Sequence, residues 1–270
     1  MERICYRQVF FFLLLVFVLS KCGLSEKTET KSDVLTDTNF TESLPLEQIT
    51  TELEDVEVNY FVPKNLYPNA TLKQLKPVSG QTLEPGEIAF SFIKPQIANE
   101  KAFGVRLKIE NNMHHYFYKP DEKVVLPQGS FLCVAFLCDK NGFSIKKDSS
   151  YCVTKLLVGK GNQEPIDLTQ PMVCLNIPDY KEENAVFIDF MLLNFDLSND
   201  GNSIRLSIDN KIELFMKEWK PVKVSGLQPG LHDVVIELIN PNENLLDSIY
   251  ATDHQMLEIP YNNLNQRVGY

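Results

Sequence analysis

Two places in the chain put an aromatic residue beside a lysine and a proline. They are Tyr118-Lys119-Pro120, with Tyr116 just upstream, and Trp219-Lys220-Pro221. Aromatic faces stack on sugar rings, and a neighbouring lysine donates hydrogen bonds to hydroxyls or carboxylates. The alternative is packing, because repeated aromatics usually cap a core and proline ends a strand at a sheet edge. The candidate ligand-binding residues are Tyr116, Tyr118, Lys119, Trp219 and Lys220.

A metal site requires several ligands to converge on one point. The positions of the histidines in the sequence do not predict such a site. The four are His114, His115, His232 and His254. The first two are adjacent on an expected strand, so they point to opposite faces. Residues 196–201 (DLSNDG) resemble the start of a calcium loop, but the twelfth position is Ser207 rather than glutamate. A β-turn explains that segment, and calcium stays a minor alternative; we expect no cofactor.

Catalytic motifs are absent from the sequence. It contains no G-x-S-x-G, H-E-x-x-H, P-loop or G-x-G-x-x-G pattern, and no cysteine has a histidine close by. The paired acids Glu182-Glu183 fall in a polar segment, 179–184, that reads as a solvated turn. These observations favour a protein that is not an enzyme.

Four cysteines fall in the body of the chain: Cys133, Cys138, Cys152 and Cys174. Cys133 and Cys138 are five apart on one expected strand, so they face opposite ways and cannot bond to each other. Cys138 and Cys152 could be neighbours across a hairpin and form a disulfide. The alternative is that all four are small buried hydrophobes.

Short alternating segments determine the predicted fold class. Residues 88–92, 105–109 and 204–208 alternate apolar and polar side chains, and turn dipeptides such as Pro85-Gly86 and Pro229-Gly230 separate such runs. No window shows a helical stripe over three turns. We therefore expect an all-β body.

An internal repeat divides this body. Residues 105–129 match residues 204–230 in order, from a shared Arg-Leu-x-Ile step, through the aromatic-Lys-Pro step, to a closing Leu…Gly. A period near one hundred residues has the size of one β-sandwich. We predict two tandem immunoglobulin-like β-sandwich domains, 57–170 and 171–262, with the boundary near 164–178 and a C-terminal tail at 263–270.

Residues 227–234 (LQPGLHDV) resemble the E–F corner of immunoglobulin-like and fibronectin type III modules, where an L-x-P-G turn feeds a long core strand. Asp233 stands where the fibronectin type has its corner tyrosine. The resemblance implies a generic bacterial immunoglobulin-like sandwich.

The N-terminus reads as an export signal. A short basic head precedes eleven apolar residues, 9–19, and Leu19-Ser20-Lys21-Cys22 follows. A bilayer-spanning helix needs about 20 apolar residues, so this run is too short. L-S-K-C resembles the bacterial lipoprotein box, which implies a signal peptide at 1–21, lipidation of Cys22 and attachment to a bacterial envelope membrane.

Charge is distributed unevenly along the chain. Its net charge is −10, and residues 25–56 hold nine acids against two lysines. We therefore expect residues 22–56 to form a lipidated, acidic and flexible tether. The chain after residue 56 is only mildly acidic and has no positively charged surface that would attract a polyanion. This argues against nucleic acid as a partner.

The function expected is that of a non-enzymatic, membrane-anchored envelope lipoprotein whose two modules bind or scaffold a protein or glycan ligand. Two alternatives stay open. One is an extracytoplasmic hydrolase with a site at the inter-domain junction, near residues 179–184. The other is a secreted eukaryotic protein without lipid, for which Asn39 and Asn69 are glycosylation acceptors.

Overall fold

Segments that alternate apolar and polar residues form β-strands throughout the body, as a period of two requires. The computed structural model describes residues 47–51, 55–63, 67, 69–95, 103–109, 113–117, 121–160, 166–197 and 201–260. Their regular elements are strands and one 3-10 turn, Asp148–Ser150, so the predicted all-β class is confirmed. No helix in these ranges is long and apolar enough to cross a bilayer. The leader, Cys22 and the tail at 263–270 lie outside the described residues.

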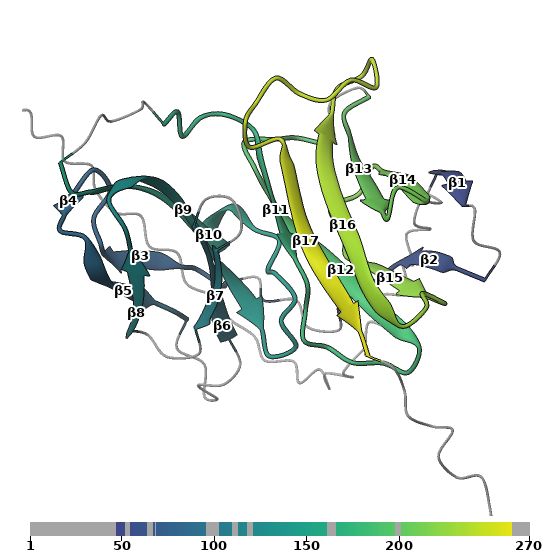
Figure 1. The fold of residues 1–270 in the computed structure, drawn as a ribbon, viewed down its shortest axis with the longest axis horizontal. Helices are drawn as coiled ribbons and strands as arrows, with labels where there is room; N and C mark the ends of the chain where they lie inside the picture. Colours follow the sequence, from purple (N-terminus) through teal and green to yellow (C-terminus); the bar gives the residue numbers. More distant parts are fainter. Residues whose placement is uncertain are drawn as a thin grey trace, which may run out of the picture. The chain divides into compact units, whose positions relative to one another are not determined.

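The first sandwich pairs a three-stranded sheet with a five-stranded one (Figure 1). The smaller sheet has the order β3 (Lys73–Lys76), β5 (Gly86–Ile93), β8 (Asp121–Leu126). The larger has the order β4 (Thr82–Leu83), β10 (Tyr151–Val158), β9 (Gly129–Asp139), β6 (Phe103–Ile109), β7 (Met113–Phe117).

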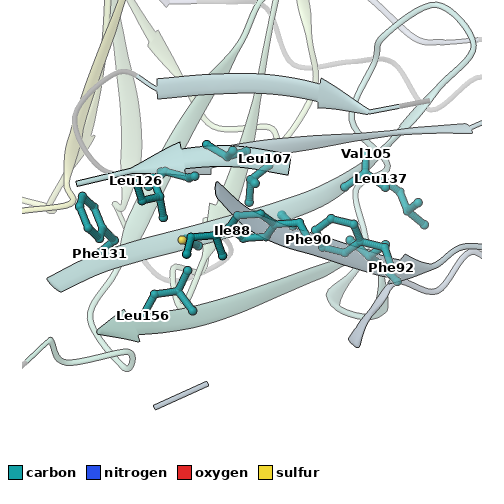
Figure 2. Packing of buried hydrophobic residues seen from close by; sticks show 14 of the residues in the cluster. Ile88, Phe90, Phe92, Val105, Leu107, Leu126, Phe131, Leu137 and Leu156 are labelled. Atoms are coloured by element: carbon teal, nitrogen blue, oxygen red, sulfur yellow. The ribbon is translucent and has the colours of Figure 1, made fainter. Parts of the chain in front are cut away.

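Inward-facing residues of both sheets form the first core. Figure 2 shows Phe90 of β5, Leu107 of β6, Leu126 of β8 and Leu137 of β9 within it, and all four side chains are fully buried. Each contributes about 1.5–3 kcal/mol relative to an exposed position. This burial is what the alternating sequence pattern encodes.

The second sandwich has the same plan. One sheet has the order β11 (Met172–Asn176), β12 (Ala185–Leu193), β15 (Val222–Ser225), β2 (Glu57–Tyr60). The other has the order β1 (Glu47–Thr51), β14 (Ile212–Met216), β13 (Ser203–Ile208), β16 (Gly230–Ile239), β17 (Thr252–Ile259). A second core of buried side chains lies between them.

Strand order explains the sequence repeat. The run β3-β5-β8 of the first sandwich corresponds to β11-β12-β15 of the second, and β10-β9-β6-β7 corresponds to β17-β16-β13-β14. The matching segments 105–129 and 204–230 therefore occupy equivalent positions in two copies of one topology. That topology is the one expected of immunoglobulin-like sandwiches.

The second sandwich also contains two strands that the sequence reading assigned elsewhere. β1 falls within the expected tether and pairs with β14, while β2 falls within the expected first domain and pairs with β15 (Figure 1). Val58 and Tyr60 of β2 pack against the second core. Open strand edges supply backbone partners that a local sequence pattern does not reveal, and this is why residues 47–60 were assigned differently.

A third cluster of buried side chains joins the two sandwiches, and we call it the interface cluster. Outward-facing residues of β9, among them Val134 and Phe136, meet Met172 of β11 and Met191 of β12 there. These strands are buried on both faces, so their sequences read as continuous apolar runs rather than alternating ones.

A histidine occupies the polar position of the E–F corner. His232 Nε2 lies 2.7 Å from the carbonyl oxygen of Gln228, and its Nδ1 lies 2.7 Å from Asp209 Oδ2. A corner tyrosine likewise bonds the backbone a few residues upstream. The resemblance had pointed to position 233, but the side chain with this role lies one residue earlier.

All four described cysteines are free thiols. Cys133 lies in the first core and Cys138 in the interface cluster, which confirms that they face opposite ways. Cys152 stands opposite Ala135 in the β9–β10 pairing, so the Cys138–Cys152 disulfide is not formed. Burial raises the pKa of the Cys152 thiol to about 12.

Candidate functional site

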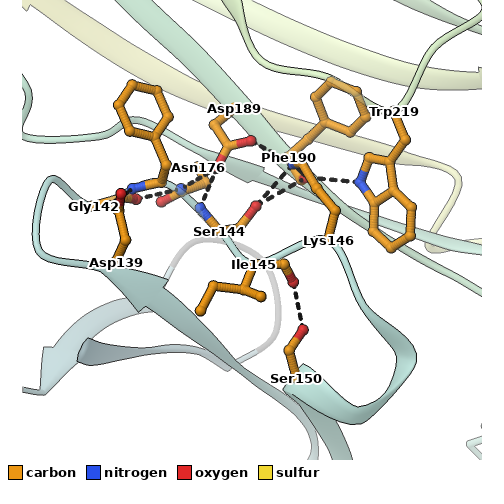
Figure 3. A network of polar contacts seen from close by, with 11 residues as sticks. Asp139, Gly142, Ser144, Ile145, Lys146, Ser150, Asn176, Asp189, Phe190 and Trp219 are labelled. Atoms are coloured by element: carbon orange, nitrogen blue, oxygen red, sulfur yellow. Dashed lines mark hydrogen bonds and ion pairs between the residues drawn. The ribbon is translucent and has the colours of Figure 1, made fainter. Parts of the chain in front are cut away.

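Trp219 is the predicted binding residue that the structure places most clearly. It lies between β14 and β15, is half-buried, and packs against both the second core and the interface cluster. Its indole N–H donates to the carbonyl oxygen of Phe190 at 3.1 Å (Figure 3). The packing interpretation therefore holds for part of this side chain.

Lys220 points toward different neighbours. Its ammonium pairs with the Glu218 carboxylate and lies 5.8 Å from the centroid of the Tyr60 ring. Because Tyr60 belongs to β2, this lysine helps to hold that strand in place. We had expected Lys220 and Trp219 to act together in one binding face. The contacts of Lys220 with Glu218 and Tyr60 do not favour this arrangement.

The first copy of the aromatic–lysine step is largely outside the described residues. Tyr116 lies in β7, where its backbone stands opposite Arg106. Tyr118 and Lys119 fall outside the described ranges, as does Cys22. A ligand site at Tyr116, Tyr118 and Lys119 stays a prediction, and so does lipidation at Cys22.

A groove opens beside Trp219, and we call it the Trp219 groove. Its volume is about 780 Å³. Seven of its lining residues carry aromatic rings or polar groups: Asp148, Tyr151, Asn194, Phe195, Asp196, Asn202 and Trp219. Ligand sites typically have volumes of about 300–1,000 Å³ and combine apolar walls with a few polar groups. This groove meets both criteria.

Elements of both sandwiches position these groups. Tyr151 begins β10 and packs against the interface cluster, and burial together with the nearby Asp148 carboxylate raises its pKa. Phe195 follows β12 and packs against the second core. Asn202 donates to the carbonyl oxygen of Asp196 at 3.0 Å, which fixes the groove's polar rim. The sequence had indicated a β-turn at Asp196, with calcium binding as a minor alternative, and nothing local marked Tyr151 or Phe195.

A buried polar network lies behind Trp219 (Figure 3). Lys146 of the first sandwich pairs with Asp189 of β12 and also donates to the carbonyl oxygen of Phe190. Its ammonium lies 5.7 Å from the Trp219 ring centroid. Burial lowers the pKa of Lys146, and the Asp189 carboxylate acts against that shift. The network fixes the orientation of the indole from behind.

The Asp189 carboxylate is fully buried and has further partners. It accepts a hydrogen bond from the backbone N–H of Ser144 at 2.5 Å and from Asn176 Nδ2 at 2.8 Å. Asn176 also donates to the carbonyl oxygen of Gly142 at 2.8 Å. A carboxylate engaged in this way joins two segments of the chain and is not presented to a substrate.

The segment suggested for a hydrolase site, 179–184, is bound to its surroundings. The Tyr180 ring packs in tilted or edge-to-face contact with the Phe61, Phe143 and Phe187 rings, at centroid distances of 5.0–6.1 Å. Glu182 pairs with Lys223. Its contacts are those of packing and of a solvated turn. Among the described residues, no group of three His, Cys, Asp or Glu side chains could hold a metal ion.

No family model and no curated protein matches this chain. Solved structures with some similarity include the fibronectin(III)-like modules of Clostridium thermocellum CbhA, with 13% identity over 70% of this chain and 94% of that one, TM-score 0.26. Another is the central fibronectin-III array of RIM-binding protein, with 4% identity over 72% and 69%, TM-score 0.26.

A third is SGBP-B of a Bacteroides ovatus mixed-linkage glucan utilization locus, solved with a mixed-linkage heptasaccharide. It shares 10% identity over 70% of this chain and 47% of that one, TM-score 0.23. Likenesses with identities and TM-scores this low establish neither a shared function nor shared site residues.

Proposed function

We propose that this protein is a non-enzymatic, exported binding protein that is anchored by lipid at Cys22 and holds a glycan in the Trp219 groove. The observation that carries the proposal is the groove itself, in which three aromatic rings lie with carboxylate and amide groups. Rings stack on sugar faces, while acceptors and donors at the rim bind hydroxyls.

Electrostatics narrow the ligand class. Asp148 and Asp196 are exposed acids at the groove, and they disfavour an anionic ligand. A neutral glycan avoids this repulsion and can donate hydroxyl hydrogens to the same carboxylates. The proposal therefore names a neutral saccharide.

Binding is tested by calorimetry of the purified chain with neutral oligosaccharides. Because Trp219 also packs against two clusters, we use Trp219→Phe, which retains a ring, together with Asp196→Asn at the exposed rim. Each variant should weaken binding at least fivefold. Leu231→Ser, an exposed change on β16, is the control and should leave affinity unchanged. Unaltered affinity in both groove variants, or binding only to a protein partner, would refute the glycan proposal.

Anchoring has its own test. The intact mass of the native N-terminus should correspond to a lipidated Cys22, and Cys22→Ser should move the protein from the membrane to the soluble fraction. Recovery of the native protein with residues 1–21 still attached would overturn the anchor.

A further inference from the structure

A second hollow lies next to the Trp219 groove, and we call it the Lys108 hollow. Its volume is about 120 Å³. Six of its lining residues define its character: Lys108, Leu132, Val134, Met172, Thr252 and Asp253. It combines an apolar wall with the Lys108 ammonium, the Asp253 carboxylate and the hydroxyls of Thr252 and Tyr250.

Two chain segments border both hollows. Pro171 lines the groove and Met172 lines the Lys108 hollow, and consecutive Cα atoms are about 3.8 Å apart. Leu246 lines the groove and Tyr250 lines the hollow, four residues further along. The two cavities are therefore bordered by the same two stretches of chain, 171–172 and 246–250.

The segment between the two cavities is held in place, yet it exposes an apolar side chain. Ser248 Oγ donates to the carbonyl oxygen of Pro171 at 2.9 Å, and Val173 N–H donates to the carbonyl oxygen of Tyr250 at 3.0 Å. Ile249, between them, is 81% exposed and lines the Lys108 hollow.

The chemistry of the Lys108 hollow selects a small, neutral substituent. The Lys108 ammonium pairs with the Asp253 carboxylate, so the hollow presents no uncompensated positive charge to an anion. An ammonium has three N–H donors, so it can also bind a carbonyl oxygen of a ligand. Leu132, Val134 and Met172 form a wall suited to a methyl group. The acetamido group of an N-acetylated sugar carries such a carbonyl joined to a methyl group.

We propose that the ligand is an extended, N-acetylated neutral glycan, with one sugar in the Trp219 groove and the acetamido group of a neighbouring sugar in the Lys108 hollow. This inference rests on the proposed function of the groove. It adds a second subsite, a substituent preference and a dependence of affinity on chain length.

The test compares N-acetylglucosamine oligomers with glucose oligomers of the same linkage, from monomer to tetramer, by calorimetry on the full chain. The N-acetylated tetramer should bind at least tenfold more tightly than the glucose tetramer and than its own monomer. Equal affinities for the two series would overturn the inference while leaving the glycan proposal standing. If neither series binds, the proposed function itself fails.

A blocking variant locates the subsite. Thr252 is exposed on β17, so Thr252→Phe should fill the hollow without disturbing a core. This variant should lower affinity for the N-acetylated tetramer at least tenfold and leave binding of the glucose tetramer unchanged. The matched control is Thr82→Phe, at an exposed threonine of β4, which should change neither affinity. Retention of the acetamido preference in Thr252→Phe would contradict the assignment.

Discussion

Lys146 and Asp189 form an ion pair buried between the two sandwiches, behind Trp219. One partner comes from the segment after β9 and the other from β12, so the pair ties together residues far apart in sequence. Removing only one charge of such a buried pair destabilises the fold, because the other charge then stays buried without a counter-charge.

Asp189→Asn should therefore lower the free energy of unfolding by about 3–5 kcal/mol, because it leaves a buried ammonium without its counter-charge. Adding Lys146→Met should recover part of this loss, since the unpaired charge is then gone. Urea unfolding of the wild type, both single variants and the double variant measures the effect. A single-variant change below about 0.5 kcal/mol would show that the pair does not stabilise the junction.

The Asp209 carboxyl should make the stability of the fold vary with pH in the acid range. Partial burial acts to raise its pKa, but hydrogen bonds from His232 and from the backbone N–H of Asp233 outweigh this and hold the pKa below its usual value. A carboxyl with a lowered folded pKa stabilises the fold above its unfolded pKa and loses that contribution as pH falls through the folded value.

Asp209→Asn should accordingly reduce the loss of stability between about pH 5 and pH 2, the range in which such carboxyls protonate. Thermal unfolding at a series of pH values tests this, with Asp247→Asn, an exposed carboxyl between β16 and β17, as control. If the acid dependence of Asp209→Asn matches that of the wild type, the bond to His232 does not influence stability.

Gly226 allows the second sandwich to accept its extra strand. Its φ is +86°, and a β-carbon there would overlap the carbonyl oxygen of Asp55, just before β2. Gly80 has a similar φ of +77° but open space around it. Gly80→Ala should cost about 1–2 kcal/mol from backbone strain alone.

Gly226→Ala should cost clearly more, about 3 kcal/mol or greater, because backbone strain and displacement of β2 add together. Chemical denaturation of the two variants side by side provides the measurement. Equal losses would mean that residues 55–60 contribute little to the second sandwich.

The described thiols should be inert in the folded protein. Burial raises the pKa of Cys152 and Cys174 to about 12, so almost no reactive thiolate exists near pH 8. Iodoacetamide followed by peptide mass mapping should label Cys133, Cys138, Cys152 and Cys174 only after urea is added. Fast labelling of Cys133, Cys138 or Cys174 in the native protein would contradict their burial.

Local patterns in the sequence predicted the strands and the repeat, because both depend on residues close together in the chain. The alternation in residues 88–92 and 204–208 places every second side chain in a core, and the structure agrees. The opposite orientations of Cys133 and Cys138 follow from the same period.

Contacts between distant segments were not predictable in this way. β2 carries a short alternating pattern, but nothing in it indicates that its partner is β15. Of the groove residues, Trp219 was identified by its place in the repeat. Tyr151 and Phe195 were missed, because they contribute to the groove only once the two sandwiches pack together.

The pairing of β2 with β15 also affects how the chain is made. Residues 57–60 are synthesised long before residues 222–225, against which they lie. The first sandwich can close while translation continues. The second sandwich cannot close until residues 222–225 have been made, so β2 lacks its partner strand during much of synthesis and needs protection from mispairing.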